Sequence, residues 1–505
     1  MTLDVDRPDL TLGIVGTGIM GRGIAQIAAL GGCRVILLDS RPGAAQEARI
    51  YVEGMLSKLA EKGKLGAAER DAAAARLSVA EDFSELSPCH VVVEAIVEKI
   101  EAKQELMTRL ETVVRDDCLL ATNTSSLSVT SIARACRLPG RVAGFHFFNP
   151  VPLMKVVEVI AGVMTETWAA DALTALARRM GHRPVRAKDT PGFIVNHAGR
   201  GFGTEALRIL SEGVAEVPDI DRVLKGAAGF RMGPFELLDL TGLDVSHPVM
   251  ESVYTQFYHE PRFRPSPITA QRLDAGLLGR KSGRGFYVYD KDGAQVPPPP
   301  TAPSFRPTAV WLDGGATAAP VAALLAELGC AVAAGAPPTD ALCVVAPVGE
   351  DATSMAVRLG LDPRRTVGID PLFGLRSHRT VMTTPVTRPE YRAAAQGLFA
   401  TDGVPVTVIN DSPGLIAQRV VATIINIACD IAQQRIATPD DIDGAVTLGL
   451  GYPTGPLAWG DAIGSATVLE ILDHMHAITG DPRYRPSLWL RRRALLGVSL
   501  HTTEN

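Results

Sequence analysis

A run of closely spaced glycines near the start of the chain most constrains its fold. An apolar segment at 12–15 precedes the run, and a helical pattern rich in alanine and isoleucine follows it. The order predicts a buried strand, a tight turn and a helix whose first N–H groups face a pyrophosphate. The first glycine would permit the turn, the second would let phosphates approach, and the third would let helix and strand pack closely. The turn comprises Gly16, Thr17, Gly18, Ile19, Met20 and Gly21.

A second predicted strand, 34–38, ends in Asp39. This carboxylate follows the glycine turn by about 20 residues, the spacing at which an acid accepts a hydrogen bond from a ribose 2′-OH. The strand, turn, helix, second strand and acid together predict a dinucleotide site. Asp39 favours NAD because its charge would repel the 2′-phosphate of NADP, whereas nearby Arg41 is the feature that favours NADP.

Length and composition limit the class of protein. A chain of 505 residues is too long for one core and suggests about three or four domains. Its net charge of −5 argues against nucleic acid or an anionic membrane as a partner. Seven cysteines without paired spacing predict reduced thiols and no metal site. With neither a signal peptide nor a run of ~18 apolar residues, we expect a soluble cytoplasmic protein.

Strands and helices alternate through the first part of the chain. This alternation predicts an α/β Rossmann-type, doubly wound domain. Polar side chains gather just past the predicted strands, where ligands of open α/β sheets bind. The residues concerned are Glu98, Lys103, Ser125, His146 and Asn149.

Two features in this part allow either a structural or a functional interpretation. The helical stretch 43–76 contains the basic segment 58–64, which is either a solvated helix face or a docking surface for an anionic tail. The strand at 154–160 places Glu158 among apolar residues, where an unpaired carboxylate would be costly to bury. Glu158 is either an edge-strand carboxylate facing water or, as we favour, the partner of a nearby histidine.

The second half of the chain repeats part of the first. Residues 189–196 reappear as 411–418, and 233–239 reappear as 455–461. The offset is 222 residues in both cases, as 411 against 189 and 455 against 233 show. Matches in one register indicate duplication of an all-α domain.

The stretch between the two copies resembles a degenerate Rossmann-like domain. We interpret it as a worn copy of the nucleotide domain, with Gly314-Gly315 after its first strand but no complete glycine turn. The region near 368–371 has neither the histidine nor the asparagine of the first copy, and Gln418 replaces Asn196. We therefore expect no chemistry in the second half. The predicted domains are 1–188 (Rossmann), 189–290 (helical), 291–307 (proline-rich linker), 308–404 (degenerate Rossmann-like) and 405–505 (repeated helical).

In combination, these motifs resemble the 3-hydroxyacyl-CoA dehydrogenase family. The resemblance is strong over 10–290 and weaker over 405–500. The long two-repeat form is similar to bacterial 3-hydroxybutyryl-CoA and 3-hydroxyadipyl-CoA dehydrogenases of the phenylacetate-pathway type. The motifs are the glycine turn and residues 93–98, 123–127, 146–150, 155–158, 189–196 and 281–286.

The chemistry of the resemblance suits four polar residues. Oxidation of a secondary alcohol needs a base for the hydroxyl proton, and a neutral histidine such as His146 serves near physiological pH. Glu158 would fix the tautomer of His146 and stabilise the imidazolium. Ser125 can donate to the substrate oxygen, and Asn196 can orient that oxygen or the histidine.

The resemblance also implies contacts to NAD and to CoA. Lys62 aligns best with the family lysine that meets the CoA phosphates; its companion serine aligns with Met55, so Ser57 or Lys64 would substitute. His197 follows Asn196 where the family usually has arginine, a departure that bears on the acyl pocket or a domain contact. The implied NAD contacts are Glu98, Lys103, Asn149 and Lys281, with Ser125 touching both ligands.

Two other functions and one assembly remain open at this stage. A sugar-acid or hydroxy-acid dehydrogenase of the same fold would need no CoA, and a non-catalytic NAD-binding protein would keep the site without turnover. The repeated helical domain predicts a pseudo-dimeric protomer, and such protomers can still pair as a homodimer. The sequence does not fix the acyl chain length.

Overall fold

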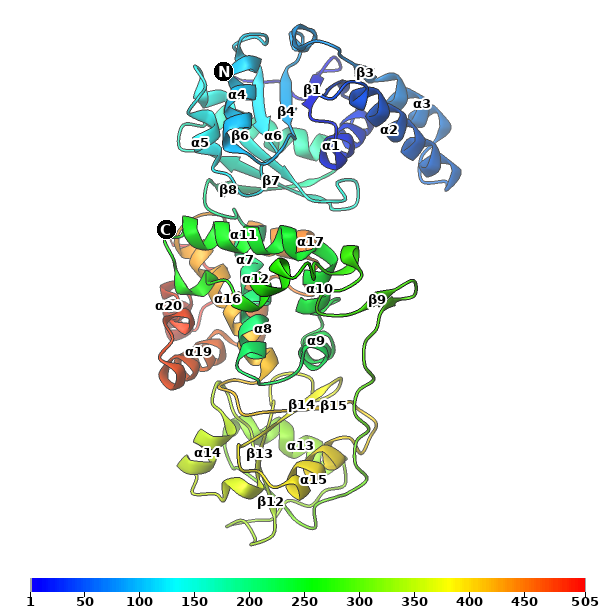
Figure 1. Ribbon diagram of the computed structural model, residues 1–505. Coiled ribbons are helices and arrows are strands. Elements are labelled where there is room, and N and C mark those ends of the chain that lie inside the picture. The colour runs from blue at the N-terminus through cyan, green and yellow to red at the C-terminus, as the bar shows by residue number, and fades with distance from the viewer. Residues whose placement is uncertain (1, 505) are drawn as a thin grey trace. The chain divides into compact units, whose positions relative to one another are not determined.

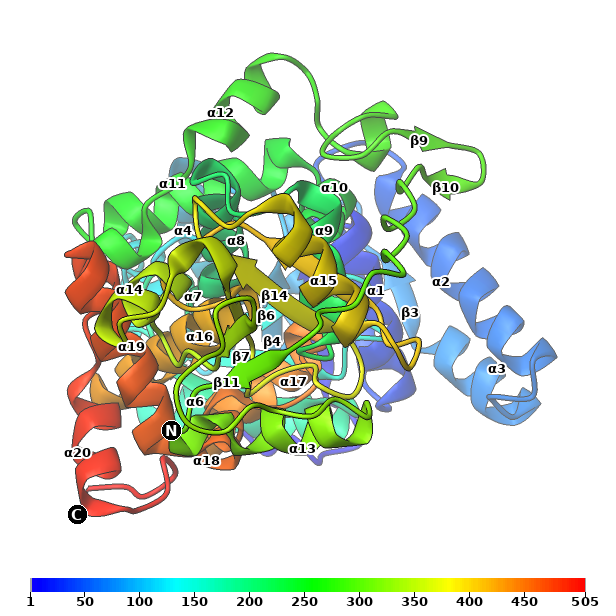
Figure 2. The ribbon, with the colours of Figure 1, turned by 90° about the horizontal axis from the view of Figure 1, so that it is seen from below.

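The computed structural model describes residues 2–504 and consists of two compact units. The first unit contains the chain up to His197 together with Gln434–Leu450. The second contains Ala198–Gln433 together with the chain from Gly451 onward. Figures 1 and 2 trace the elements of both units by colour along the chain.

The first unit is built on an eight-stranded sheet in the order β3-β2-β1-β4-β5-β6-β7-β8. All neighbouring strands are parallel except β6 and β7, which are antiparallel. This sheet confirms the predicted doubly wound fold. The strands are β1 Thr11–Val15, β2 Arg34–Leu38, β3 Leu77–Val79, β4 Val91–Glu94, β5 Leu119–Thr122, β6 Val142–Phe147, β7 Val156–Ala161 and β8 Arg183–Lys188.

Helices form two hydrophobic cores with the strands of this sheet. Helices α1 and α6 contribute to one core, and α4 contributes to the other. The single helix expected over 43–76 is wrong, because Gly63 adopts a left-handed φ of +66° and separates α2 from α3. The helices are α1 Ile19–Leu30, α2 Ala44–Glu61, α3 Ala67–Ala75, α4 Ile100–Glu111, α5 Val129–Ala133, α6 Thr167–Arg179 and α7 Val195–Ala198.

The repeated motif at 189–196 does not begin a long helix, as its proline and capping residues predicted. Gly192 and Phe193 both have positive φ, and helix α7 starts only at Val195. The Asp189 carboxylate instead caps α5, accepting hydrogen bonds from the N–H groups of Val129 and Thr130 at 3.0 and 2.7 Å. This motif is a turn that ties two parts of the first unit together.

The second unit contains helices from both copies of the repeat. Helices α10 and α18 begin and end 222 residues apart, so the duplication extends from sequence to structure. Helix α8 packs against α16. The helices are α8 Arg200–Ser211, α9 Val217–Gly226, α10 Pro234–Thr241, α11 Leu243–Gln256, α12 Pro267–Asp274, α16 Ile416–Gln433, α18 Pro456–Ile463, α19 Ser465–Thr479 and α20 Leu488–Leu496.

The second unit also holds a five-stranded sheet in the order β11-β12-β13-β14-β15. Its only antiparallel pair among the described residues is β13–β14. A small hairpin, β9 Tyr289–Asp290 and β10 Gly293–Ala294, precedes it. The strands are β11 Val310–Leu312, β12 Leu342–Val345, β13 Thr366–Ile369, β14 Arg379–Thr383 and β15 Val406–Ile409; the helices are α13 Ala319–Glu327, α14 Ala352–Arg358 and α15 Pro389–Phe399.

The order and directions of these five strands match β4 to β8 of the first sheet. Strand β11 therefore corresponds to β4, and the second sheet has no counterpart of β1, β2 and β3. Gly314-Gly315 is consequently not the remnant of a glycine turn that its position suggested. The strand expected at 331–333 is reduced to one bridge, between Val310 and Val332.

None of the helices within residues 2–504 has the length and apolar character needed to cross a membrane.

Candidate active site

The glycine turn has the geometry that a pyrophosphate needs. Gly16 has φ +91°, and a Cβ on Gly21 would collide with the carbonyl oxygen of Gly16. A Cβ on Gly18 would meet no heavy atom within 4 Å, so the space beside this glycine is open. The turn at the start of α1 therefore leaves room for phosphates against its backbone.

Asp39 closes the turn at the end of β2. Its Oδ2 accepts hydrogen bonds from the N–H and hydroxyl of Thr17 at 2.7 and 2.8 Å, and its Oδ1 accepts one from Arg41 N–H at 3.0 Å. Burial opposes ionisation of Asp39, but the hydrogen bonds from Arg41 and Thr17 outweigh it and lower the pKa. The Arg41 guanidinium pairs with Glu47 at 2.6 Å. An ionised acid beside an occupied arginine favours a free ribose 2′-OH over a 2′-phosphate.

His146 and Glu158 face each other on the antiparallel strands β6 and β7. His146 Nδ1 lies 2.6 Å from Glu158 Oε2. Glu158 is fully buried, and its Oε1 accepts hydrogen bonds from the N–H groups of Ile194 and Val195, each at 2.9 Å. Since β7 lies between β6 and β8, the alternative of an edge carboxylate facing water is wrong.

Aromatic rings surround the imidazole of His146. The ring centroids of Phe148 and Phe193 lie 4.4 and 5.8 Å from it, and only 4% of His146 is exposed. Because Nδ1 faces an acid, it carries the proton in the neutral ring, and Nε2 is the nitrogen available to a substrate. A dry site of this kind strengthens the attraction between imidazolium and carboxylate.

Glu98 organises the polar loop that follows β5. Its Oε1 accepts hydrogen bonds from the Thr124 hydroxyl and from the N–H groups of Ser125 and Ser126, at 2.7, 2.7 and 2.9 Å. Burial opposes the ionisation of Glu98, but the charge of Lys103 and these hydrogen bonds lower its pKa. The loop that carries Ser125 is thus fixed by an ionised acid.

Lys103 is buried between two acids. Its Nζ lies 2.7 Å from Glu94 Oε1 and 3.3 Å from Glu98 Oε2, and it is 1% exposed. Thr122 also donates to Glu94, at 2.6 Å. The sequence reasoning missed Glu94 and Thr122; the signal was an acid ending an apolar strand, nine residues before a lysine. In this arrangement Lys103 holds Glu98 in place.

The remaining predicted residues are distributed over both units. Asn196 Nδ2 donates to the carbonyl oxygen of Ser125 at 3.3 Å, which brings these two residues together in the first unit. Asn149 is exposed three residues beyond His146. Lys281 belongs to the second unit, where it pairs with Asp244 at 2.5 Å, and its contact with NAD stays a prediction.

Two of the three residues predicted to bind CoA are exposed. Lys62 and Lys64 lie just past the end of α2, on either side of left-handed Gly63. Ser57 is half-buried and donates to the carbonyl oxygen of Glu53 at 3.0 Å. The two lysines can therefore reach an anion, whereas Ser57 already has a partner in its own helix.

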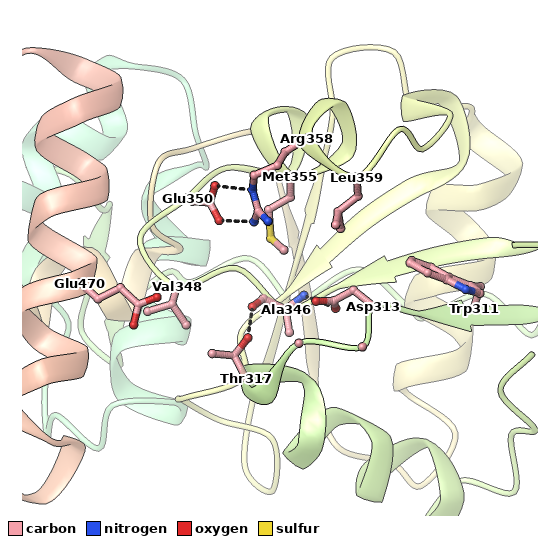
Figure 3. Close-up of a pocket in the computed structure, with 12 residues that line it drawn as sticks. Trp311, Asp313, Thr317, Ala346, Val348, Glu350, Met355, Arg358, Leu359 and Glu470 are labelled. Atoms are coloured by element: carbon pink, nitrogen blue, oxygen red, sulfur yellow. Dashed lines mark hydrogen bonds and ion pairs between the residues drawn. The ribbon is translucent and has the colours of Figure 1, made fainter. Parts of the chain in front are cut away.

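A cavity of about 420 Å³ lies in the second sheet, at the carboxyl ends of β11 and β12 (Figure 3). Three acids line it, Asp313, Glu350 and Glu470, and its Arg358 is paired with Glu350 at 2.7 Å. The Asp313 carboxylate accepts a hydrogen bond from Ala346 N–H at 3.1 Å. With an excess of acids and no glycine turn, this cavity is unsuited to a pyrophosphate.

The second sheet also lacks the histidine and glutamate pair. Its strand register places Asp370 where His146 stands and Thr380 where Glu158 stands. Asp370 is buried, accepts a hydrogen bond from Gln418 Nε2 at 3.0 Å, and has its pKa raised to about 6 by burial. Side chains of the protein itself therefore occupy this part of the second copy.

Comparison with known proteins agrees with this division of the chain. The model of the 3-hydroxyacyl-CoA dehydrogenase NAD-binding domain matches residues 11–190. The model of the C-terminal domain of the same family matches twice, at 192–289 and 414–503. The double match confirms the predicted duplication of the helical domain.

Individual relatives cover either the whole chain or its first half. The 3-hydroxyadipyl-CoA dehydrogenase of Escherichia coli K12 is 38% identical over 96% of this chain and 98% of its own length. A probable 3-hydroxybutyryl-CoA dehydrogenase of Deinococcus radiodurans is 40% identical over 55% of this chain and all of its own length. The crystal structure of 3-hydroxybutyryl-CoA dehydrogenase from E. coli K12 aligns with a TM-score of 0.86 at 37% identity, over 97% of this chain and 98% of that one. The chain belongs to the 3-hydroxyacyl-CoA dehydrogenase family.

Proposed function

We propose that this protein oxidises (S)-3-hydroxyacyl-CoA to 3-oxoacyl-CoA with NAD, and that His146 is the general base. The observation that carries the proposal is the 2.6 Å contact between His146 Nδ1 and the buried carboxylate of Glu158. That contact leaves Nε2 to accept a proton, and it places a negative charge against the imidazolium that results.

The reaction divides between the cofactor and this pair. When bound, NAD accepts the hydride that leaves C3 of the substrate. His146 Nε2 takes the hydroxyl proton, so the C–O bond becomes a carbonyl and the imidazole becomes imidazolium. Glu158 keeps its own proton-free form because two backbone N–H groups and His146 all donate to it. Ser125 and Asn196, which contact each other, hold the substrate oxygen.

The cofactor contacts follow from the first unit. The open space at Gly18 accommodates the pyrophosphate, and Asp39 binds the adenosine ribose. Glu98 and Asn149 contact the nicotinamide end, with Lys103 holding Glu98. Lys281 completes the set from the helical domain.

Replacing Lys62 with alanine should weaken acyl-CoA binding. The exposed ammonium next to the end of α2 would lose its charge-assisted contact with the CoA phosphates, so KM for acetoacetyl-CoA should rise about tenfold. Steady-state kinetics measure this change. S-acetoacetyl-pantetheine, which lacks the nucleotide phosphates, serves as the control and should show the same KM in both proteins. An equal rise for both substrates would show that Lys62 acts elsewhere.

The substrate is proposed from the relatives and tested by a comparison of chain lengths. Their printed names favour 3-hydroxybutyryl-CoA or 3-hydroxyadipyl-CoA. The phenylacetate-type resemblance points to the second. Initial rates with short, medium and long 3-hydroxyacyl-CoA, 3-hydroxyadipyl-CoA and sugar acids, each with NAD and NADP, separate the candidates. Turnover of sugar acids without acyl-CoA turnover would overturn the proposal, as would NADH binding with no turnover.

We expect the protein to act in the cytoplasm and to form homodimers. Within residues 2–504, none of the cysteines forms a disulfide, which suits a reducing compartment. The repeated helical domain makes each protomer pseudo-dimeric. Light scattering that gives one chain per particle would remove the homodimer.

A further inference from the structure

A segment of the second helical repeat folds as part of the first unit. Residues 434–450, including helix α17 (Pro439–Leu450), lie along β7 and β8. Strand β8 is the edge of the first sheet, and the segment caps its outward N–H groups. Lys188 N–H donates to the carbonyl oxygen of Ile436 at 2.9 Å, and Arg186 N–H donates to Asp441 at 3.3 Å. The edge of the catalytic sheet is thus covered by the copy that carries no catalytic pair.

The second unit contains the same contact with the roles of the repeats reversed. Asn410 N–H, just past β15, donates to the carbonyl oxygen of Val214 at 2.9 Å. Asn410 and Val214 correspond to Lys188 and Ile436 at the common offset of 222 residues. Each sheet therefore receives a segment from the helical repeat that belongs to the other.

The end of α17 reaches the elements that hold Glu158. A Cβ on Gly449 would lie 3.0 Å from a methyl of Val195 and 3.5 Å from a methyl of Val156. Val195 donates its N–H to Glu158 Oε1, and Val156 is on the same face of β7, two residues before Glu158. Gly449 thus touches both the strand that carries the acid and the turn that binds it.

We infer that α17 is a positioning element for the catalytic pair, with Gly449 as its point of contact. Pressure from α17 holds the turn at 192–195 against Glu158, and Glu158 in turn orients His146. Glycine is needed because a methyl group at 3.0 Å from Val195 would push the turn outward. The inference rests on the proposed role of His146 and Glu158, and it gives the degenerate half of the chain a part in the reaction.

The test is Gly449→Ala in the full-length protein. We expect kcat for 3-hydroxybutyryl-CoA to fall about tenfold while the Kd of NADH stays within about twofold, because small misplacements of a catalytic group are costly. Adding Val195→Ala removes the clash, so the double variant should recover the kcat of Val195→Ala alone.

Gly444→Ala is the matched control in the same helix. A Cβ there would meet only the guanidinium of exposed Arg183, which can move, while the gain in helix propensity is the same as at Gly449. This variant should keep the wild-type kcat. A fall in kcat equal to that of Gly449→Ala would overturn the inference, and so would a kcat for Gly449→Ala equal to wild type.

Hydrogen–deuterium exchange provides a readout that needs no substrate. In Gly449→Ala the amides of 192–197 should exchange faster, since those of Ile194 and Val195 bond Glu158; Gly444→Ala should leave them unchanged. Unchanged exchange at 192–197 would contradict the positioning role even if the protein turned over no acyl-CoA. Absence of turnover in the wild-type enzyme, with faster exchange in the variant, would overturn the proposed function alone.

Discussion

His146→Ala is expected to lower kcat for 3-hydroxybutyryl-CoA by about 10³- to 10⁴-fold, the usual effect of losing a positioned general base. The substrate hydroxyl would have to lose its proton to water in a site that is closed by Phe148 and Phe193. Binding of NADH should stay within about twofold of wild type, because the glycine turn and Asp39 do not contact this histidine. Steady-state kinetics and a fluorescence titration measure the two quantities.

His90→Ala is the control for removing a buried histidine from the same sheet. His90 Nδ1 accepts a hydrogen bond from Thr11 N–H at 3.1 Å, at the start of β1. Its loss leaves a buried N–H without a partner and should cost about 1–3 kcal/mol of stability, while kcat is preserved. If His146→Ala kept more than a tenth of wild-type kcat, His146 would not be the base.

Arg419→Ala should produce the largest loss of stability. Arg419 and Glu205 are buried in the second unit, with Arg419 Nε 2.6 Å from Glu205 Oε1 and Nη2 2.9 Å from the hydroxyl of Tyr484. Removing the arginine strips Glu205 of its nearest cation and should cost about 3–5 kcal/mol. Calorimetry or denaturant titration of the full-length protein measures the change. The double variant Arg419→Ala, Glu205→Gln should recover part of the loss, and a cost below about 1 kcal/mol would contradict the account.

The same pair gives stability a pH dependence. Burial opposes the ionisation of Glu205, but Arg419, Arg483 and a hydrogen bond from Tyr484 outweigh it and lower the pKa. A carboxyl whose folded pKa is lowered contributes its full stabilisation above its unfolded value of about 4.3, and the contribution is lost as pH falls through the folded value. Arg419→Ala should therefore lose less stability on acidification than wild type does.

The parts of the fold that rest on local pattern could be predicted from the sequence. Apolar runs gave the strands of the first sheet, and the spacing of glycines and Asp39 gave the nucleotide turn. The pairing of His146 with Glu158 could be expected because an acid inside an apolar strand needs a partner. Each of these inferences uses residues close in sequence or a cost that any buried charge incurs.

The parts that were missed depend on contacts between distant segments. Asp189 had the composition of a helix cap for its own segment, but it caps α5, 60 residues earlier in the chain. Strand β11 looked like β1 because both begin an α/β region, and only pairing order shows that it matches β4. The placement of α17 on β8 is set by backbone groups, which carry no sequence signature.

Differences between the copies explain why one half keeps the chemistry. The second sheet lacks the strands that bear the glycine turn, and Asp370 and Thr380 occupy the positions of the catalytic pair. What the second copy retains is its helices, which pack with those of the first copy and supply α17.

Calorimetric titration of the full-length protein with NADH tests most directly the claim that a duplicated chain has one working site. The account predicts one equivalent of NADH per 53.5 kDa chain, bound at the glycine turn. Two equivalents per chain would contradict it, because the cavity lined by Asp313 and Glu350 would then be a second dinucleotide site.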